Sequence, residues 1–289
     1  MEEEKIKKKV REGYAKIAKE GLYCGPTSSC CDSSMTYEEL SKKMGYTEKE
    51  LQSVPEGANL SLGCGNPVAL AYLKEGQTVL DLGSGAGLDC FLARKKVGEK
   101  GKVIGVDMTP EMIDKARENA RKGNYENVEF RLGEIENLPV ADNTADVIIS
   151  NCVINLSPNK KRVFKEAFRA LKPGGRLMVS DIVLLKELPE DIKKKAHPAS
   201  CVPGAIMKDK YLEAIEQAGF QEVTIVEETQ SSFEDIINDP NARVVIKNPD
   251  QNTEEIKSVC EAKEEVKEIV REILNSTASI NVSAIKPSK

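Results

Sequence analysis

The amino-acid sequence predicts an α/β fold, a doubly wound and mostly parallel β-sheet with helices on both faces. From residue 77 onward, apolar runs suited to β-strands alternate with helical segments, which is typical of such a sheet. A glycine-rich turn follows the first of these runs, at the point where a strand would lead into a helix. Hydrophobic residues make up 40% of the 289 residues, which is enough for a substantial core.

The strands are predicted where the apolar runs occur, at residues 77–82, 102–108, 127–132, 145–151 and 175–182. Helices are predicted at 87–97, 110–122, 159–171 and 208–218. Thr109 and Pro110 suit the N-cap and the first position of the second of these helices. The KPGG segment at 172–175 is expected to form a turn before the fifth strand.

Two further strands are expected near the carboxyl end, at 221–228 and 278–286. Between them an apolar stripe predicts one helix near 254–274, and packing on the core explains this stripe more simply than a partner surface. The stripe consists of Ile256, Val259, Val266, Ile269, Val270, Ile273 and Leu274.

The residues before the sheet form a segment of different character. Residues 1–20 place Ile6, Val10, Tyr14 and Ile17 at helical spacing, and short helices are expected at 36–44 and 47–52. The small residues of CGPTSSCC at 24–31 predict a loop. We therefore expect three parts: a helical and cysteine-bearing segment (1–54), a core domain (55–230), and a helical insertion with the final strand (231–289).

The charge balance excludes several classes of partner. The formal net charge is −5 and charges of both signs are interspersed, so neither nucleic acid nor an anionic membrane is expected as a partner. The first residues are too polar for a signal peptide, and no apolar run approaches the roughly 20 residues that a membrane-spanning helix needs. These observations predict a cytoplasmic protein.

Eight cysteines stand out in this composition. A disulfide framework is not expected in a chain of this size without export signals. A zinc site is not expected either, because the chain has no Cys-x-x-Cys pair and a single histidine, His197. Most of the cysteines are therefore interpreted as small buried residues, among them Cys90, and Cys260 is given no role.

The most specific local signal is TVLDLGSGAG at 78–87. Its glycines let the backbone turn tightly and bring a ligand against a helix N-terminus. The dinucleotide motif would place its third glycine one position later, where Leu88 stands. Asp81 would suit a ligand with an ammonium group, so the motif favours S-adenosylmethionine over NAD. The candidate cofactor residues here are Asp81, Gly83, Ser84, Gly85 and Gly87.

Further candidate cofactor residues follow the next strands in order. Asp107 ends the second strand, where an acid can hold ribose hydroxyls by charge-assisted hydrogen bonds, and Met108 follows it. Glu134 and Ile135 lie beyond the third strand, where an adenine would be held, and Asn151 ends the fourth.

This series, together with LKPGGRL at 171–177, resembles the class I S-adenosylmethionine-dependent methyltransferases over roughly residues 55–230. The resemblance implies a Rossmann-like sheet of seven strands with the last strand antiparallel. It also implies methyl transfer from a sulfonium.

Three cysteines occupy positions that core packing explains poorly. Cys152 ends the fourth strand and is expected to point into the cleft at the carboxyl edge of the sheet. Cys64 lies between glycines in LGCGNP at 62–67, and Cys201 lies in the connection after the fifth strand. Their separations in sequence do not show whether they meet.

The segments LGCGNP, DLGSG, SNCVINL (150–156) and the one around Cys201 resemble the arsenite methyltransferase family, in this order. The resemblance implies that Cys64, Cys152 and Cys201 are arsenic ligands in the methylation of arsenite and then methylarsenite, a detoxification reaction. It also implies a redox-active cysteine near the amino end, for which Cys30 and Cys31 both fit and Cys24 is a weaker third. A glutathione- or thioredoxin-like thiol reductant would then be a partner.

Two other functions compete with this one. The first is methylation of another small acceptor, such as a quinone or a carbon acid, on the same fold. It would predict aromatic or basic residues around the substrate, whereas aromatic residues make up 4% of the chain and Trp is missing from it. The second is a non-enzymatic metalloid-binding protein, which would leave the glycine turn and Asp107 unexplained.

Overall fold

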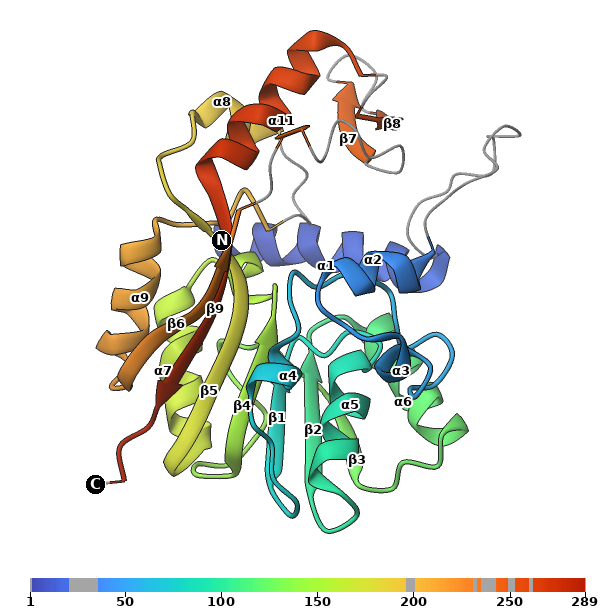
Figure 1. The fold of residues 1–289 in the computed structure, drawn as a ribbon, viewed down its shortest axis with the longest axis vertical. Helices are drawn as coiled ribbons and strands as arrows, with labels where there is room; N and C mark the ends of the chain where they lie inside the picture. The colour runs from blue at the N-terminus through green and yellow to red at the C-terminus, as the bar shows by residue number, and fades with distance from the viewer. Residues whose placement is uncertain are drawn as a thin grey trace.

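The computed structural model describes residues 2–20, 36–195, 201–230, 233–234, 243–248, 253–259 and 262–288, and its centre is a seven-stranded sheet. The strands lie in the order β3-β2-β1-β4-β5-β9-β6, and β9 runs antiparallel between β5 and β6 (Figure 1). This arrangement confirms the predicted fold class. The strands are β1 (Thr78–Leu82), β2 (Lys102–Asp107), β3 (Val128–Leu132), β4 (Ala145–Asn151), β5 (Leu171–Leu184), β6 (Gln221–Thr229) and β9 (Thr277–Ile285).

Helices cover both faces of the sheet because successive strand residues point to opposite sides. Val79 packs with Phe91 of α5 (Leu88–Val97) and with α6 (Pro110–Lys122) on one face. Its neighbour Leu80 belongs to the core cluster on the other face, which also includes Phe164 of α7 (Lys160–Ala170) and residues of α9 (Lys208–Gln217). The other helices whose bounds the described residues give are α1 (Glu2–Glu20), α2 (Tyr37–Lys43), α3 (Glu48–Leu51), α4 (Pro67–Leu70), the 3-10 turn η1 (Ile154–Leu156), α8 (Glu190–Lys195) and α11 (Glu264–Ser276).

The turn expected at 172–175 is wrong, because these residues belong to β5. The backbone N–H of Gly174 donates to the carbonyl of Lys286 at 2.8 Å, which extends the pairing of β5 toward the carboxyl end of the chain. The register between β4 and β5 shifts between Ala145 and Val147. The glycines are thus accommodated in an irregular strand rather than in a turn.

The single helix expected near 254–274 is also wrong in its first part. Thr253–Ser258 forms β8, which pairs antiparallel with β7 (Arg243–Asn248) and sets Ile256 opposite Val245. Cross-strand pairing with the VVI run of β7 therefore overrides the helical spacing in this segment. Val259 is buried in the turn after β8. The other stripe residues lie on α11, where Ile269 and Ile273 pack against the cluster around Leu184.

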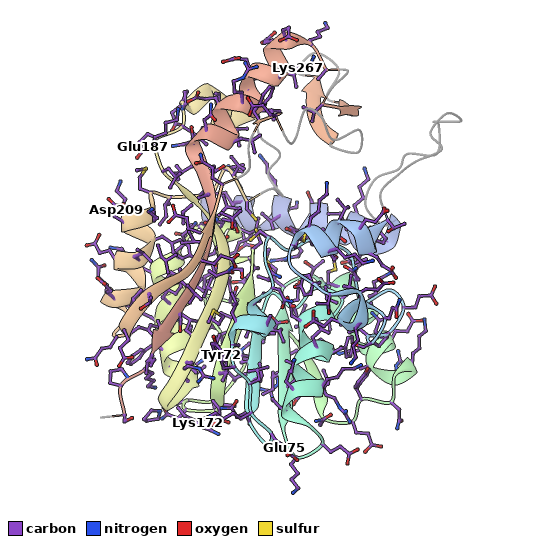
Figure 2. All side chains as sticks on the ribbon, viewed as in Figure 1. Tyr72, Glu75, Lys172, Glu187, Asp209 and Lys267 are labelled. Atoms are coloured by element: carbon purple, nitrogen blue, oxygen red, sulfur yellow. The ribbon has the colours of Figure 1, made fainter. Side chains whose placement is uncertain are left out.

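Helix α1 lies across the end of the sheet at which the functional candidates gather (Figure 1). Tyr14 and Ile17 pack with Leu60 and Met112, and Lys7 forms an ion pair of 2.7 Å with Glu134. Figure 2 shows the labelled Tyr72, Glu75 and Lys172 toward the opposite end of the molecule. None of the described helices is long and apolar enough to span a membrane.

Candidate active site

A cavity opens at the carboxyl ends of β1, β2 and β4. Its walls come from the turn after β1, the residues after β2 and β4, the segment 58–63 and the inner side of α1. Its mixture of apolar side chains with a few polar groups suits a small-molecule substrate or cofactor. The parallel strands explain the location, since their carboxyl ends meet at one edge of the sheet.

The glycine turn after β1 lines this cavity with backbone atoms and with the hydroxyl of Ser84. The N–H groups of Gly83 and Ser84 donate to the carbonyl of Val106 at 2.8 and 3.0 Å, which holds the turn against β2. Gly85 has a φ of +50°, and a Cβ added there would meet nothing within 4 Å. The buried Ser84 Oγ has no hydrogen-bond partner in the described part of the chain. A ligand can therefore approach this turn closely and satisfy the hydroxyl.

Asp107 forms the neighbouring part of the wall. Its Oδ2 accepts a hydrogen bond from the N–H of Gly85 at 3.0 Å, and its Oδ1 accepts one from the N–H of Thr109 at 2.8 Å. Burial raises the pKa of Asp107, while the hydrogen bonds from Thr109 and Gly85 act in the opposite direction. The carboxylate is thus oriented at the cavity wall and keeps lone pairs that can accept from a ligand.

Three of the predicted cofactor residues do not line this cavity. Asp81 is 2% exposed and accepts a hydrogen bond from Cys90 Sγ at 3.2 Å. Burial, and then the charge of Asp89, raise the pKa of Asp81 well above its usual value. Gly87 packs under the wall instead, where an added Cβ would approach the ring of Phe91 to 2.7 Å.

The third such residue is Glu134, whose carboxylate forms ion pairs with Lys7 and Arg11 of α1. Its neighbour Ile135 does line the cavity, as do Met108 after β2 and Asn151 at the end of β4. Glu134 and Ile135 are adjacent in the sequence but differ in the direction of their side chains, which a sequence motif does not specify.

A buried hydrogen-bond network connects the cavity to the loop that carries Cys64. Asn151 Nδ2 donates to the hydroxyl of Tyr46 at 2.9 Å, to Asp89 Oδ2 at 3.1 Å and to the carbonyl of Gly65 at 2.8 Å. Its Oδ1 accepts from the N–H of Cys64 at 2.9 Å. Tyr46 in turn donates to Asp89 Oδ1 at 2.7 Å. Burial raises the pKa of Asp89 to about 6.

Three free thiols gather beside the cavity. Cys152 Sγ lies 2.8 Å from Cys201 Sγ, which also lies 3.0 Å from the carbonyl oxygen of Cys152. Cys64 Sγ lies within 4.8 Å of Cys152 Sγ. Cys152 itself lines the cavity wall, next to the turn at Gly83 and Gly85. The structure thus brings together three cysteines that are far apart in the sequence.

Separate backbone segments hold these thiols in place. Cys152 follows β4 with a φ of +57°, and its N–H donates to the carbonyl of Ser180 in β5 at 2.8 Å. The carbonyl of Cys64 accepts from Ser279 Oγ in β9 at 3.0 Å. A left-handed backbone conformation is unusual for residues other than glycine. Where such a residue adopts it, as Cys152 does, the position is often a functional one.

Two thiols of the cluster, those of Cys152 and Cys64, are uncharged at neutral pH. Hydrogen bonding to Cys201 and Cys64, together with burial, raises the pKa of Cys152 well above its usual value. Burial likewise raises the pKa of Cys64. Both thiols therefore keep their protons at neutral pH.

Sequence reasoning missed three residues near the thiols. Asp181 in β5 has a carboxylate oxygen within 4.8 Å of Cys64 Sγ and Cys152 Sγ, and burial raises its pKa to about 7. The polar pair at 180–181 inside an otherwise apolar strand could have signalled it. Tyr46 gave no such signal. The sequence placed Tyr14 only by its helical spacing, yet burial, and then the nearby Cys201 and Cys152, raise the pKa of Tyr14 well above its usual value.

Several residues singled out in the sequence lie outside the described residues. They concern the redox candidates Cys24, Cys30 and Cys31, and also His197 and Cys260. Cys90 is fully buried, which confirms its interpretation as a core residue.

Comparison with known proteins gives a consistent picture. A family model described as "Methyltransferase domain" matches residues 73–219. The arsenite methyltransferase of Halobacterium salinarum is 49% identical over 238 residues, which is 79% of this chain and 61% of that protein. The arsenite methyltransferase of Aquipseudomonas alcaligenes is 38% identical over 217 residues, 72% of this chain and 60% of that protein. The chain thus spans about three fifths of the length of these relatives.

Among solved structures, the arsenic(III) S-adenosylmethionine methyltransferase CrArsM from Chlamydomonas reinhardtii matches with a TM-score of 0.60 and 29% identity. The match covers 88% of this chain and 75% of that one. The resemblance to arsenite methyltransferases that the motifs indicated is therefore confirmed.

Proposed function

The chain belongs to the methyltransferase domain family, and we propose that it transfers the methyl group of S-adenosylmethionine to trivalent arsenic. The observation that carries this proposal is the cluster of Cys64, Cys152 and Cys201 beside the glycine-turn cavity. The similarity to proteins named arsenite methyltransferase supports the same substrate. Arsenite would be methylated first and methylarsenite second.

The cavity wall fits S-adenosylmethionine. Asp107 would accept hydrogen bonds from the ribose hydroxyls, and the unpaired Ser84 Oγ would gain a partner. Met108 and Ile135 offer apolar contacts for the adenine. Asp89, rather than the deeper Asp81, faces the cavity and would pair with the ammonium group. When bound, the cofactor supplies a methyl group on a positively charged sulfur.

The protonated thiols suit arsenite because arsenite is an uncharged trihydroxide near neutral pH. Each As–O bond that breaks releases a hydroxide, which leaves as water with the proton of the thiol that forms the new As–S bond. No net charge enters the buried site, so the exchange avoids the cost of burying separate charges. Soft sulfur ligands also match the soft arsenic centre, which carboxylates would hold poorly.

Three As–S bonds leave a lone pair on arsenic, directed away from the sulfurs. Cys152 at the cavity wall would hold arsenic beside the cofactor cavity, where its lone pair could form the new As–C bond with the methyl group that the cofactor supplies. The electrons of the broken S–C bond would remain on the sulfur of the cofactor. No side chain has to remove a proton in this step, so positioning supplies much of the acceleration.

Methylation oxidises arsenic formally to the pentavalent state, and two electrons must return to it. A further thiolate can attack one arsenic-bound sulfur, which forms a disulfide, breaks the As–S bond and leaves the electron pair on arsenic. We assign this thiolate to Cys30 or Cys31 of the amino-terminal segment. A glutathione- or thioredoxin-like thiol would then reopen the disulfide by exchange.

The direct test is incubation of the protein with arsenite and excess thiol, with and without S-adenosylmethionine, followed by chromatographic separation of the arsenic species. Methylated arsenic is expected only when S-adenosylmethionine is present. Bound but unmethylated arsenic in both samples would favour a metalloid-binding protein. Methylation of a quinone in the absence of any methylated arsenic would favour another acceptor.

The change Asp107→Ala is expected to weaken the binding of S-adenosylmethionine by about 2 kcal/mol, the range for a lost hydrogen bond to a charged group. The affinity for arsenite should stay nearly the same, because Asp107 does not contact the thiols in the described structure. Calorimetric titration with each ligand measures both effects.

A matched control is Asp142→Ala, which removes an exposed carboxylate that pairs with Arg169 away from the cavity. Asp107→Asn keeps one acceptor oxygen and should lose less affinity than Asp107→Ala. Unchanged cofactor affinity in Asp107→Ala would contradict the ribose assignment.

A further inference from the structure

Asn151 uses its whole amide to connect two parts of the site. On one side it donates to Asp89 Oδ2 and to the hydroxyl of Tyr46. On the other side it accepts a hydrogen bond from the N–H of Cys64 and donates one to the carbonyl of Gly65. A Cβ added to Gly63 would lie 2.7 Å from Asn151 Oδ1, so the backbone of this loop rests directly on the amide. The position of Cys64 therefore depends on the orientation of Asn151.

Tyr46 fixes that orientation. Its hydroxyl accepts from Asn151 Nδ2 and donates to Asp89 Oδ1, so the three side chains form a closed triangle of hydrogen bonds. Tyr46 is 3% exposed, and its ring packs in the core cluster that includes Val68 and Phe91. The ring is held by packing, and the hydroxyl links Asp89 to Asn151.

Asp89 is the member of the triangle that faces the cavity. Both of its oxygens accept hydrogen bonds from uncharged donors, and none of the described lysines or arginines forms an ion pair with it. A buried carboxylate without a cationic partner is costly, so a positively charged ligand group in the cavity would be strongly favoured next to it. Such a group would hold Asp89 in its charged form, the form in which both of its oxygens can accept the hydrogen bonds from Tyr46 and Asn151.

We infer that Tyr46, Asp89 and Asn151 act as positioning residues that couple the cofactor cavity to the Cys64 loop, so that cofactor and arsenite bind cooperatively. The inference rests on the proposed function and adds the regulation of the same site. An ammonium group at Asp89 favours the charged carboxylate that the triangle requires, and the triangle holds the amide of Asn151 in the orientation that Cys64 and Gly65 need. Cys64 is then in place to bind arsenic. By thermodynamic reciprocity, arsenite must tighten cofactor binding by the same factor.

The test is a pair of calorimetric titrations with arsenite, one on the free protein and one on the protein saturated with S-adenosylhomocysteine. This product carries the ammonium group but has no methyl group to transfer. In the unchanged protein, saturation should tighten arsenite binding by about fivefold or more, the lower end of typical couplings between sites. In Tyr46→Phe, which keeps the ring and removes the hydroxyl, the ratio of the two affinities should fall close to one.

Tyr125→Phe is the matched control. Its ring packs against the same core cluster, its hydroxyl contacts the carbonyl of Ser53 at 3.5 Å, and it does not belong to the triangle. Tyr125→Phe should therefore keep the full coupling. Asp89→Asn serves as a second variant if Tyr46→Phe folds poorly, since it removes the charge, and it too should lose the coupling.

The outcomes separate this inference from the proposed function. A fivefold coupling that is lost in Tyr46→Phe or Asp89→Asn and kept in Tyr125→Phe supports the inference. The inference alone is overturned if the unchanged protein binds both ligands tightly but shows no coupling between them. It is also overturned if the coupling is present and survives in both Tyr46→Phe and Asp89→Asn. Failure of the unchanged protein to bind arsenite at all overturns the proposed function and the inference with it.

Discussion

Cys152→Ser is expected to abolish the methylation of both arsenite and methylarsenite, and Cys201→Ser is expected to do the same. The two thiols lie 2.8 Å apart at the cavity wall, so they form the pair that can hold any trivalent arsenical next to the methyl donor. A serine oxygen is a hard ligand that replaces sulfur poorly on arsenic. An arsenical that is not held by both thiols is no longer aligned with the methyl donor, so the rate of methylation should fall by a factor on the order of a thousand or more.

The measurement is product formation from each arsenical under excess thiol, together with a cofactor titration of each variant. Cofactor affinity should be retained, because Asp107 and the glycine turn do not depend on either thiol. Cys90→Ser is the matched control: this cysteine is fully buried, lies away from the cluster, and its replacement can still donate to Asp81. Retained activity of Cys152→Ser on arsenite would rule out the proposed arsenic site.

Cys64→Ser is expected to lose the first methylation and to keep the second. Trivalent arsenic makes three bonds, so arsenite can engage all three thiols. Methylarsenite has one position occupied by carbon and can engage only two. Cys152 and Cys201 would suffice for methylarsenite, with the lone pair still directed at the methyl donor. The assay supplies each arsenical separately with a small thiol in excess and separates the products by chromatography.

The structure supports this division of roles. Cys64 sits on its own loop, held by Asn151 and Ser279, whereas Cys152 and Cys201 contact each other directly. Serine at position 64 leaves the backbone hydrogen bonds of the loop available, so the fold should persist. Equal losses on arsenite and methylarsenite would instead mean that Cys64 supports the loop or the cofactor side of the site.

Local sequence patterns predicted most of the fold. The strand alternation placed β1, β2 and β4 within one residue of their observed ends, and the helix expected at 110–122 begins at Pro110 and ends at Lys122. The errors fall where pairing with a distant strand decides the structure. Residues 172–175 belong to β5, where Gly174 and Gly175 form backbone hydrogen bonds with Lys286 after β9, and residues 253–258 form a strand because β7 lies beside them.

The same distinction holds for the site. By itself, the sequence determined the glycine turn, the acid at the end of β2 and the cysteine at the end of β4, because each depends on a strand end that local periodicity reveals. Only the tertiary structure decided that Cys64 and Cys201 meet Cys152, that Asp89 rather than Asp81 faces the cavity, and that Tyr46 completes the hydrogen-bond triangle. Such contacts join residues far apart in the chain or depend on the direction of a side chain, and they arise from packing of the sheet with its loops rather than from any local preference.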